Sequence, residues 1–172
     1  MSPSEQQSWL RARAACEALA QALQQRQWMM ATAESCTGGL IAGACTALAG
    51  SSVWFERGFV TYSNAAKTES LGVDAALIDT QGAVSEVVAR AMAFGAIRHS
   101  RAQVSLAVTG IAGPGGGSRS KPVGTVWFGF SVDGLLSSET VRFDGDRAEV
   151  RAATAAHALT RLLQLVQERP SE

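Results

Sequence analysis

The 172-residue sequence has no long apolar run, only three cysteines and only one tyrosine. No uninterrupted apolar stretch reaches the ~18 residues that predict a transmembrane helix, so a protein of that class is excluded. Residues 1–27 mix Glu, Arg and Gln into their apolar positions, which leaves no hydrophobic core of the signal-peptide type. Because 47% of the residues are apolar and are spread along the chain, disorder is not expected. We therefore expect a globular protein of the cytoplasm.

The cysteines and the charge balance exclude further classes. Cys16, Cys36 and Cys45 are odd in number and show no CxxC spacing, which argues against a disulfide framework and against a zinc site. They are expected to be reduced thiols. The formal net charge is 0, so the sequence carries no electrostatic footprint for nucleic acid or for an anionic membrane. A small molecule is the expected partner.

Lysine is also rare: thirteen arginines accompany only two lysines, Lys67 and Lys121. One interpretation is a composition that simply favours Arg and Ala. The other is functional, because where arginine supplies the ordinary positive charge, a remaining lysine indicates a need for an amine that can lose its proton.

The apolar periodicity predicts an α/β fold. Within residues 4–26 the apolar side chains recur at spacings of three and four, which is typical of an amphipathic helix. Further helices are expected at 37–50, around Lys67, at 85–100 and at 146–168. Strands are expected at 28–35, 58–62, 102–110, 123–132 and 135–143, the last two joined by a tight turn at Asp133-Gly134. This alternation, closed by a hairpin, predicts a three-layer α/β/α sandwich on a mixed β-sheet.

A single domain is expected, because 172 residues suit one core and no repeat or linker interrupts the chain. Residues 1–26 are its N-terminal helix, residues 27–168 are its main body and residues 169–172 are a tail.

Three polar loops follow predicted strands, which is where open α/β sheets bind their ligands. They span residues 34–39, 61–67 and 109–114. The glycine-rich stretch 110–117 does not match the Walker pattern of ATP-binding loops, because Lys121 comes too late and is followed by Pro122. An anion-binding nest and a plain flexible loop both remain open for this stretch.

Ser35, in the loop AESCTGG, is a candidate nucleophile that requires a neighbouring base. The histidines are badly placed, since His99 ends a predicted helix and His157 lies within the last one. Lys67 is the alternative, because a desolvated amine can fall far enough in pKa to accept a proton near neutrality. Tyr62, five residues before Lys67, is suited to relay a proton or to hold the lysine. A solvated lysine near a half-buried tyrosine is the simpler interpretation.

Two other features are ambiguous. Cys36 is either a rival nucleophile at a helix start or a small buried residue. Asp144 and Asp146 either cap the last helix or hold a metal ion, and the cap is favoured. Arg142 and Arg147 are candidates for contact with an anionic substrate.

Six segments carry a family resemblance. They are TAESCTGG, GSSVWFERGFVTYSNAAK, GAVSE, GIAGPGGG, KPVGTVWFGF and FDGDR, within a match from about residue 10 to residue 165. Together they closely resemble the CinA C-terminal-domain family, in its stand-alone form. Members with amidase activity are nicotinamide-nucleotide amidases. The resemblance implies hydrolysis of nicotinamide mononucleotide to nicotinate mononucleotide and ammonia, in pyridine-nucleotide recycling.

The same resemblance implies roles for individual residues. Ser35 is then the nucleophile, Lys67 the base and Tyr62 the assisting hydroxyl, with no metal or organic cofactor and with homo-oligomeric assembly. Substrate contacts are expected from Thr37, Gly38, Gly39, Asn64, Thr109, Gly110, Ala112, Gly113 and Arg142. The chain departs from its relatives at Thr109, where Ser is common, and at Gly115, where Asp is common. Two alternatives stay open on sequence alone: a non-catalytic nucleotide-binding module, and a serine amidase for another small carboxamide.

Overall fold

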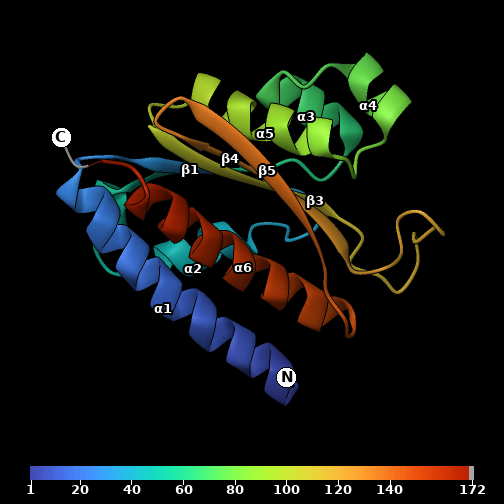
Figure 1. Cartoon of the computed structure of the whole chain (residues 1–172), viewed down its shortest axis with the longest axis horizontal. Helices are drawn as coiled ribbons and strands as arrows, with labels where there is room; N and C mark the ends of the chain where they lie inside the picture. Colours follow the sequence, from blue (N-terminus) through green and yellow to red (C-terminus); the bar gives the residue numbers. More distant parts are fainter. Residues whose placement is uncertain (171–172) are drawn as a thin grey trace.

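A computed structural model, which describes residues 1–170, shows a five-stranded sheet between two layers of helices (Figure 1). The strands are β1 (Met30–Glu34), β2 (Phe55–Val60), β3 (Val104–Gly110), β4 (Thr125–Val132) and β5 (Leu135–Arg142). The helices are α1 (Pro3–Gln25), α2 (Leu40–Thr46), α3 (Asn64–Leu71), α4 (Ala75–Gln81), α5 (Glu86–Arg98) and α6 (Arg147–Gln167), with a short 3-10 helix η1 (Ser51–Val53). The predicted α/β/α sandwich is confirmed.

The strand order β2-β1-β3-β4-β5 brings three carboxyl ends to one edge of the sheet. Strand β1 pairs in parallel with β2 and β3, whereas β3 pairs with β4, and β4 with β5, in antiparallel fashion. The turn between β4 and β5 uses Asp133 (φ 50°) and Gly134 (φ 77°), the two left-handed residues that a type I′ hairpin requires. The three polar loops that follow β1, β2 and β3 therefore meet at one edge, as predicted.

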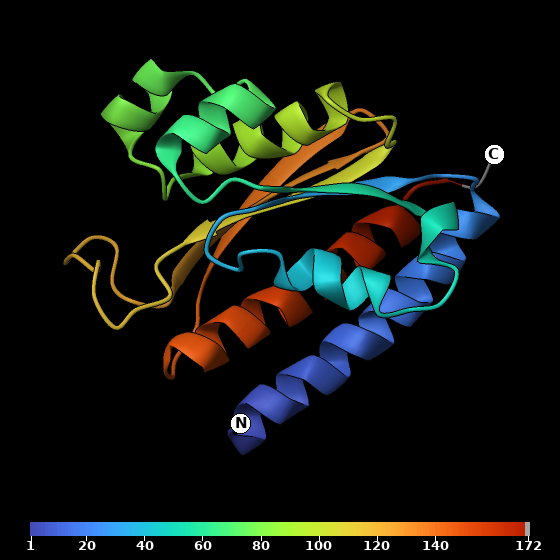
Figure 2. The same cartoon turned by 180° about the vertical axis from the view of Figure 1, so that it is seen from behind.

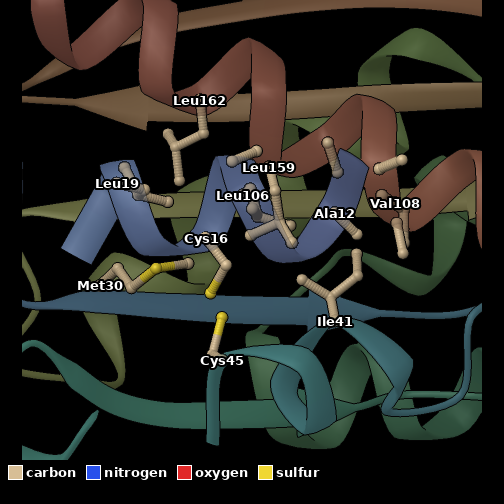
Figure 3. Close-up of a cluster of buried hydrophobic side chains, with 14 of the residues drawn as sticks. Ala12, Cys16, Leu19, Met30, Ile41, Cys45, Leu106, Val108, Leu159 and Leu162 are labelled. Atoms are coloured by element: carbon tan, nitrogen blue, oxygen red, sulfur yellow. The ribbon is translucent and has the colours of Figure 1, made fainter. Parts of the chain in front are cut away.

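Helices α1, α2 and α6 cover one face of the sheet, and α3, α4 and α5 cover the other (Figures 1 and 2). On α1 the buried residues Ala12, Cys16, Leu19 and Leu23 recur at helical spacing, and they belong to the core that α1 shares with α6. Figure 3 shows this core, with Cys16 facing Cys45 of α2. All three cysteines are free and buried. Helix α1 thus packs along α6 and is part of the layer that covers this face of the sheet.

The observed elements differ from the predicted ones in a few places. The sequence patterns do not predict α4, because its seven residues bury only Ile78 and present no amphipathic period. Strand β2 begins and ends earlier than expected, and the N–H of Thr61, just past its end, still donates to the carbonyl of Glu34 at 2.9 Å. Of the expected tail, residues 171–172 lie outside the described residues. In the part of the chain that is described, no helix is long and apolar enough to cross a membrane.

Candidate active site

Ser35 lies one residue past the end of β1, at the edge where the three polar loops meet. Its N–H donates to the carbonyl of Val108 on β3 at 3.0 Å, which continues the parallel ladder by one residue. The backbone of Ser35 is therefore fixed by two strands, and its side chain stands at the start of the turn that leads to α2.

The turn after Ser35 is built around the fully buried carboxylate of Glu34. One carboxylate oxygen accepts the hydroxyl of Thr37 at 2.7 Å and the N–H groups of Gly39 and Ile41, each at 3.0 Å. The other oxygen accepts the N–H of Ala42 at 2.8 Å. The first N–H groups of a helix have no partner within the helix, and here the Glu34 carboxylate accepts their hydrogen bonds. Thr37 and Gly39 thus both donate to Glu34, and their expected contact with substrate stays a prediction.

Lys67, on α3, places its amine against the hydroxyl of Ser35. The Nζ–Oγ distance is 3.2 Å, and Nζ also donates to the carbonyl of Thr61 at 3.0 Å. Ser63 positions this helix, because its hydroxyl caps the N–H of Ala66 at 3.0 Å. Only 1% of Lys67 is exposed, and no carboxylate within residues 1–170 forms an ion pair with it.

Burial sets the protonation of the two candidate groups beside Ser35. Desolvation lowers the pKa of Lys67 from its ordinary value of 10.5, outweighing an opposing effect of the Cys36 thiol. Desolvation raises the pKa of Cys36 to about 12, and the negative charge of Glu34 adds to this rise. The amine is thus adjusted toward its neutral, basic form, whereas the thiol is held in its unreactive form. This arrangement favours Ser35 over Cys36 as the nucleophile.

A cavity of about 210 Å³ opens over the two side chains. It is lined by Ser35, Cys36, Tyr62, Asn64, Lys67, Ala83, Val84, Thr109, Gly110, Ala112 and Arg147. The structure thus brings together residues from all three predicted loops, including the expected Asn64, Thr109, Gly110 and Ala112. The segment between α4 and α5 closes the cavity, and the hydroxyl of Thr109 donates to the carbonyl of Ala83 at 2.8 Å.

Tyr62 lies at the rim of this cavity, with 59% of its surface exposed. Its hydroxyl accepts a hydrogen bond from Nη2 of Arg147 at 2.7 Å. Nη1 of the same arginine donates to the carbonyl of Gly113 at 2.9 Å. The phenol of Tyr62 is therefore hydrogen-bonded to Arg147 on α6. The sequence had predicted a contact with Lys67 instead.

Arg142 does not line the cavity, and its expected substrate contact stays a prediction. It ends β5 in an exposed position opposite Thr125. The arginines at the site are Arg147 and, missed by the sequence reasoning, Arg151. Nε and Nη2 of Arg151 donate to the carbonyls of Cys36 and of the next residue at 3.1 and 2.8 Å. The spacing of four between the two arginines on one helix is the signal that would have paired them.

Besides Gly39, two further glycines of the predicted set do not line the cavity. Gly38 (φ 60°) lies beneath Arg151 and Tyr62, since a Cβ there would be 3.5 Å from the guanidinium and 3.9 Å from the ring. Gly113 (φ 83°) meets Arg147 through its carbonyl, and a Cβ there would come within 2.6 Å of Val123. Both glycines adopt positive φ angles and let neighbouring side chains lie close to the backbone.

The histidines and the acidic residues lie in structural contacts. His157 is 2.6 Å from the carboxylate of Glu139, and His99 contacts the carbonyl of Gly95 at 2.9 Å. Asp146 caps α6 in a capping box with Glu149. No group of three or more His, Cys, Asp and Glu side chains within residues 1–170 is arranged to hold a metal ion.

The chain is similar to known proteins of one family. A family model described as the CinA C-terminal domain matches residues 12–166. The chain is 54% identical over 144 residues to the nicotinamide-nucleotide amidohydrolase PncC of Enterobacter agglomerans, covering 83% of this chain and 88% of that protein. It is 50% identical over 151 residues to PncC of Escherichia coli (strain K12), covering 86% and 90%. The crystal structure of the competence/damage inducible protein CihA from Agrobacterium tumefaciens is similar, with a TM-score of 0.88, 45% identity and coverage of 92% and 96%.

Proposed function

The chain belongs to the CinA C-terminal domain family, and on that premise we propose that it hydrolyses nicotinamide mononucleotide to nicotinate mononucleotide and ammonia. The observation that carries this proposal is the 3.2 Å contact between Lys67 Nζ and Ser35 Oγ at the floor of a cavity. The names of the two amidohydrolase relatives supply the substrate. Cytoplasmic location and homo-oligomeric assembly stay predictions.

In the first step, neutral Lys67 takes the hydroxyl proton of Ser35 while Oγ attacks the carboxamide carbon. The C–O bond forms as the carbonyl π electrons move to oxygen, giving a tetrahedral oxyanion. The positively charged pyridinium ring withdraws electrons from the attached carboxamide, which favours this attack. The lowered pKa of Lys67 suits the step, because an ordinary lysine would be protonated near neutral pH.

Backbone N–H groups stabilise the oxyanion in this proposal. The N–H of Ser35 is not available, because it already donates to Val108. The N–H groups of Cys36 and Ala112, which both line the cavity, donate to no backbone carbonyl within residues 1–170. They are the donors we assign to the oxyanion, and losing one such donor costs about 3 kcal/mol in comparable enzymes.

The intermediate collapses when Lys67, now an ammonium, gives its proton to the amide nitrogen. The C–N bond breaks, ammonia leaves, and an ester between Ser35 and the nicotinate group remains. Water then attacks this ester with Lys67 again as the base, and the second collapse returns the proton to Ser35 Oγ. No metal ion is needed in this sequence, and each proton has a named carrier.

Ammonia release from nicotinamide mononucleotide tests the proposal with four variants. Ser35→Ala and Lys67→Ala should each lower kcat at least about 1,000-fold, because each variant removes one member of the nucleophile–base pair. Cys36→Ala should retain activity, since its thiol stays protonated. Lys121→Ala is the matched control, because this lysine instead contacts the carbonyl of Gln81. Full activity of Ser35→Ala would refute the assignment, and loss only in Cys36→Ala would move it to the thiol.

The same assay separates the two alternatives. A non-catalytic nucleotide-binding module predicts binding of the nucleotide with no ammonia from any variant. A serine amidase for another carboxamide predicts that Ser35 and Lys67 are required, but that a different amide gives the higher kcat/KM.

A further inference from the structure

Two buried thiols lie opposite each other between the first two α-helices of the chain. Cys16 lies on α1 and Cys45 on α2, and neither residue is exposed. Figure 3 shows their sulfur atoms pointing toward one another across the gap between the helices. The Sγ atom of Cys16 also donates to the carbonyl of Ala44, the residue before Cys45, at 3.8 Å. The two thiols therefore form a pair, and the proposed amide hydrolysis uses neither of them.

The contact between the two thiols makes them chemically different. It lowers the pKa of Cys16, against the opposing effects of burial and of the Glu17 carboxylate. The same contact, together with burial, raises the pKa of Cys45 well above its ordinary value. Since the thiolate is the form that reacts with oxidants, Cys16 is the thiol suited to react first and Cys45 the thiol suited to resolve the product.

A small cavity gives an oxidant a place beside this pair. The cavity has a volume of about 230 Å³ and lies between α1 and α2, lined by Trp9, Ala12, Arg13, Ala44, Ala47 and Leu48. Ala12 precedes Cys16 by one helical turn, and Ala44 directly precedes Cys45. A water molecule takes about 30 Å³ in the liquid, so the cavity has room for a peroxide. Cys45 lies in the last turn of a seven-residue helix, and helix ends open readily, which gives the peroxide access to the sulfurs.

We propose that Cys16 and Cys45 form a redox modification site, at which a peroxide converts the two thiols into a disulfide that ties α1 to α2. The Cys16 thiolate attacks one peroxide oxygen, the O–O bond breaks, and Cys16 becomes a sulfenic acid. The sulfur of Cys45 then attacks this sulfur, the S–S bond forms, and the oxygen leaves as water. In total the two sulfurs lose two electrons and two protons, and the peroxide takes them up to become two water molecules.

The pairing of the thiols decides where oxidation stops. Both cysteines belong to the apolar core beside α6, and oxidation of a single buried thiol beyond the sulfenic acid would place an unpaired charge there. A resolving thiol in contact with the first one ends the reaction at a neutral disulfide. A thiol reductant reverses that bond, so in a reducing compartment the pair stays as two thiols.

Peptide mapping of the full chain tests the proposal. Trypsin leaves Cys36 and Cys45 on one peptide, residues 27–57, so the assay uses Cys36→Ala, in which only the proposed pair remains. The protein is treated with hydrogen peroxide under conditions that convert glutathione to its disulfide, and free thiols are then blocked with iodoacetamide in urea. Mass spectrometry should show residues 14–26 and 27–57 as one linked peptide, two hydrogens lighter than their sum, and as separate peptides after dithiothreitol.

Thermal unfolding gives a second readout. The bridge closes a loop of about 30 residues, so peroxide should raise Tm by about 5 to 10 °C, and dithiothreitol should return it to the starting value. The matched control carries Cys45→Ala in addition to Cys36→Ala, which keeps the Cys16 thiol and removes its partner. Its Tm should not rise with peroxide. Each variant is compared with its own reduced form, so the loss of a core thiol does not affect the comparison.

Three results would overturn the inference. The first is that both thiols are still free after the peroxide treatment. The second is that Cys16 carries added oxygen atoms and no linked peptide is found, which means that Cys45 does not resolve the sulfenic acid. The third is a linked peptide together with an unchanged or lower Tm, which means that the bridge does not fit the folded protein.

Discussion

The N–H of Ala42 donates to the buried carboxylate of Glu34 at 2.8 Å, across the turn that contains Ser35. This contact and its neighbours seat a negative charge at the start of α2, where an anionic ligand would otherwise be attracted. The N–H groups at the start of α2 therefore already have an acceptor within the protein, the carboxylate of Glu34.

Replacing Glu34 with Gln should lower the free energy of unfolding by about 3 kcal/mol, because the NH2 group of the amide cannot accept the hydrogen bonds that one of the two buried carboxylate oxygens now accepts. It should also lower kcat, since the turn no longer holds Ser35 in place. Urea denaturation and ammonia release measure the two effects. Glu69→Gln, an exposed change on α3, is the control. Stability equal to that of wild type would show that the carboxylate does not hold the turn.

Activity should rise with pH, because neutral Lys67 is the base. The value of kcat/KM should increase until the pH passes the folded-state pKa of Lys67, which lies below 10.5, and then level off. A pH profile with nicotinamide mononucleotide measures this. Lys67→Arg should be inactive throughout, since a guanidinium does not lose its proton. A profile of the same shape in Lys67→Arg would assign the titration to another group.

Stability should depend on the same proton with a defined sign. Because the folded-state pKa of Lys67 is lowered, the unfolded chain binds more protons between that pKa and 10.5, so this group makes stability rise with pH in that window. Lys67→Met removes the buried amine and should be more stable than wild type, by about 1 kcal/mol, at pH values below the folded-state pKa of Lys67. Denaturation at several pH values should show this advantage shrinking as the pH rises. A constant difference would contradict the shift.

Cys36 should resist alkylation. A thiol with a pKa of about 12 is almost entirely protonated at pH 8, and only 6% of the residue is exposed. Iodoacetamide should therefore modify Cys36 much more slowly in the folded protein than in urea, as followed by mass spectrometry of the peptide. Rapid modification of the folded protein together with loss of activity would restore the thiol as a candidate nucleophile.

Tyr62→Phe should lower kcat/KM by less than about 10-fold, because the lost hydroxyl bonds Arg147 rather than Lys67. Ammonia release from nicotinamide mononucleotide measures this. A loss of about 100-fold or more in kcat would instead indicate the proton relay expected from the sequence.

Strand ends could be predicted from the sequence, and this located much of the site. Ser35 and Lys67 each follow a strand of the parallel part of the sheet, so their loops had to meet at one edge. The rarity of lysine then marked the base. Both arguments depend on local patterns, which a sequence displays directly.

The arginines could not be placed in the same way. Arg142 and Arg147 are close in sequence, yet one ends an edge strand while the other starts a helix that crosses beneath the turn of Ser35. Their separation depends on how α6 docks. The partner of Thr37 was equally hidden, because the carboxylate it binds belongs to a strand residue whose side-chain direction is set by the whole fold.

The packing of α1 along α6 joins the first and last helices described in the chain. During synthesis the part of the apolar face of α1 that packs on α6 has no partner until almost every other element has left the ribosome. Contacts this distant in sequence raise the contact order, and closing them late slows folding. The same late helix delivers Arg147, which bonds Tyr62, and Arg151, which bonds the turn after Ser35. A nascent chain that has already brought Ser35 and Lys67 together therefore still lacks the contacts that hold the rim of the cavity and the nucleophile turn.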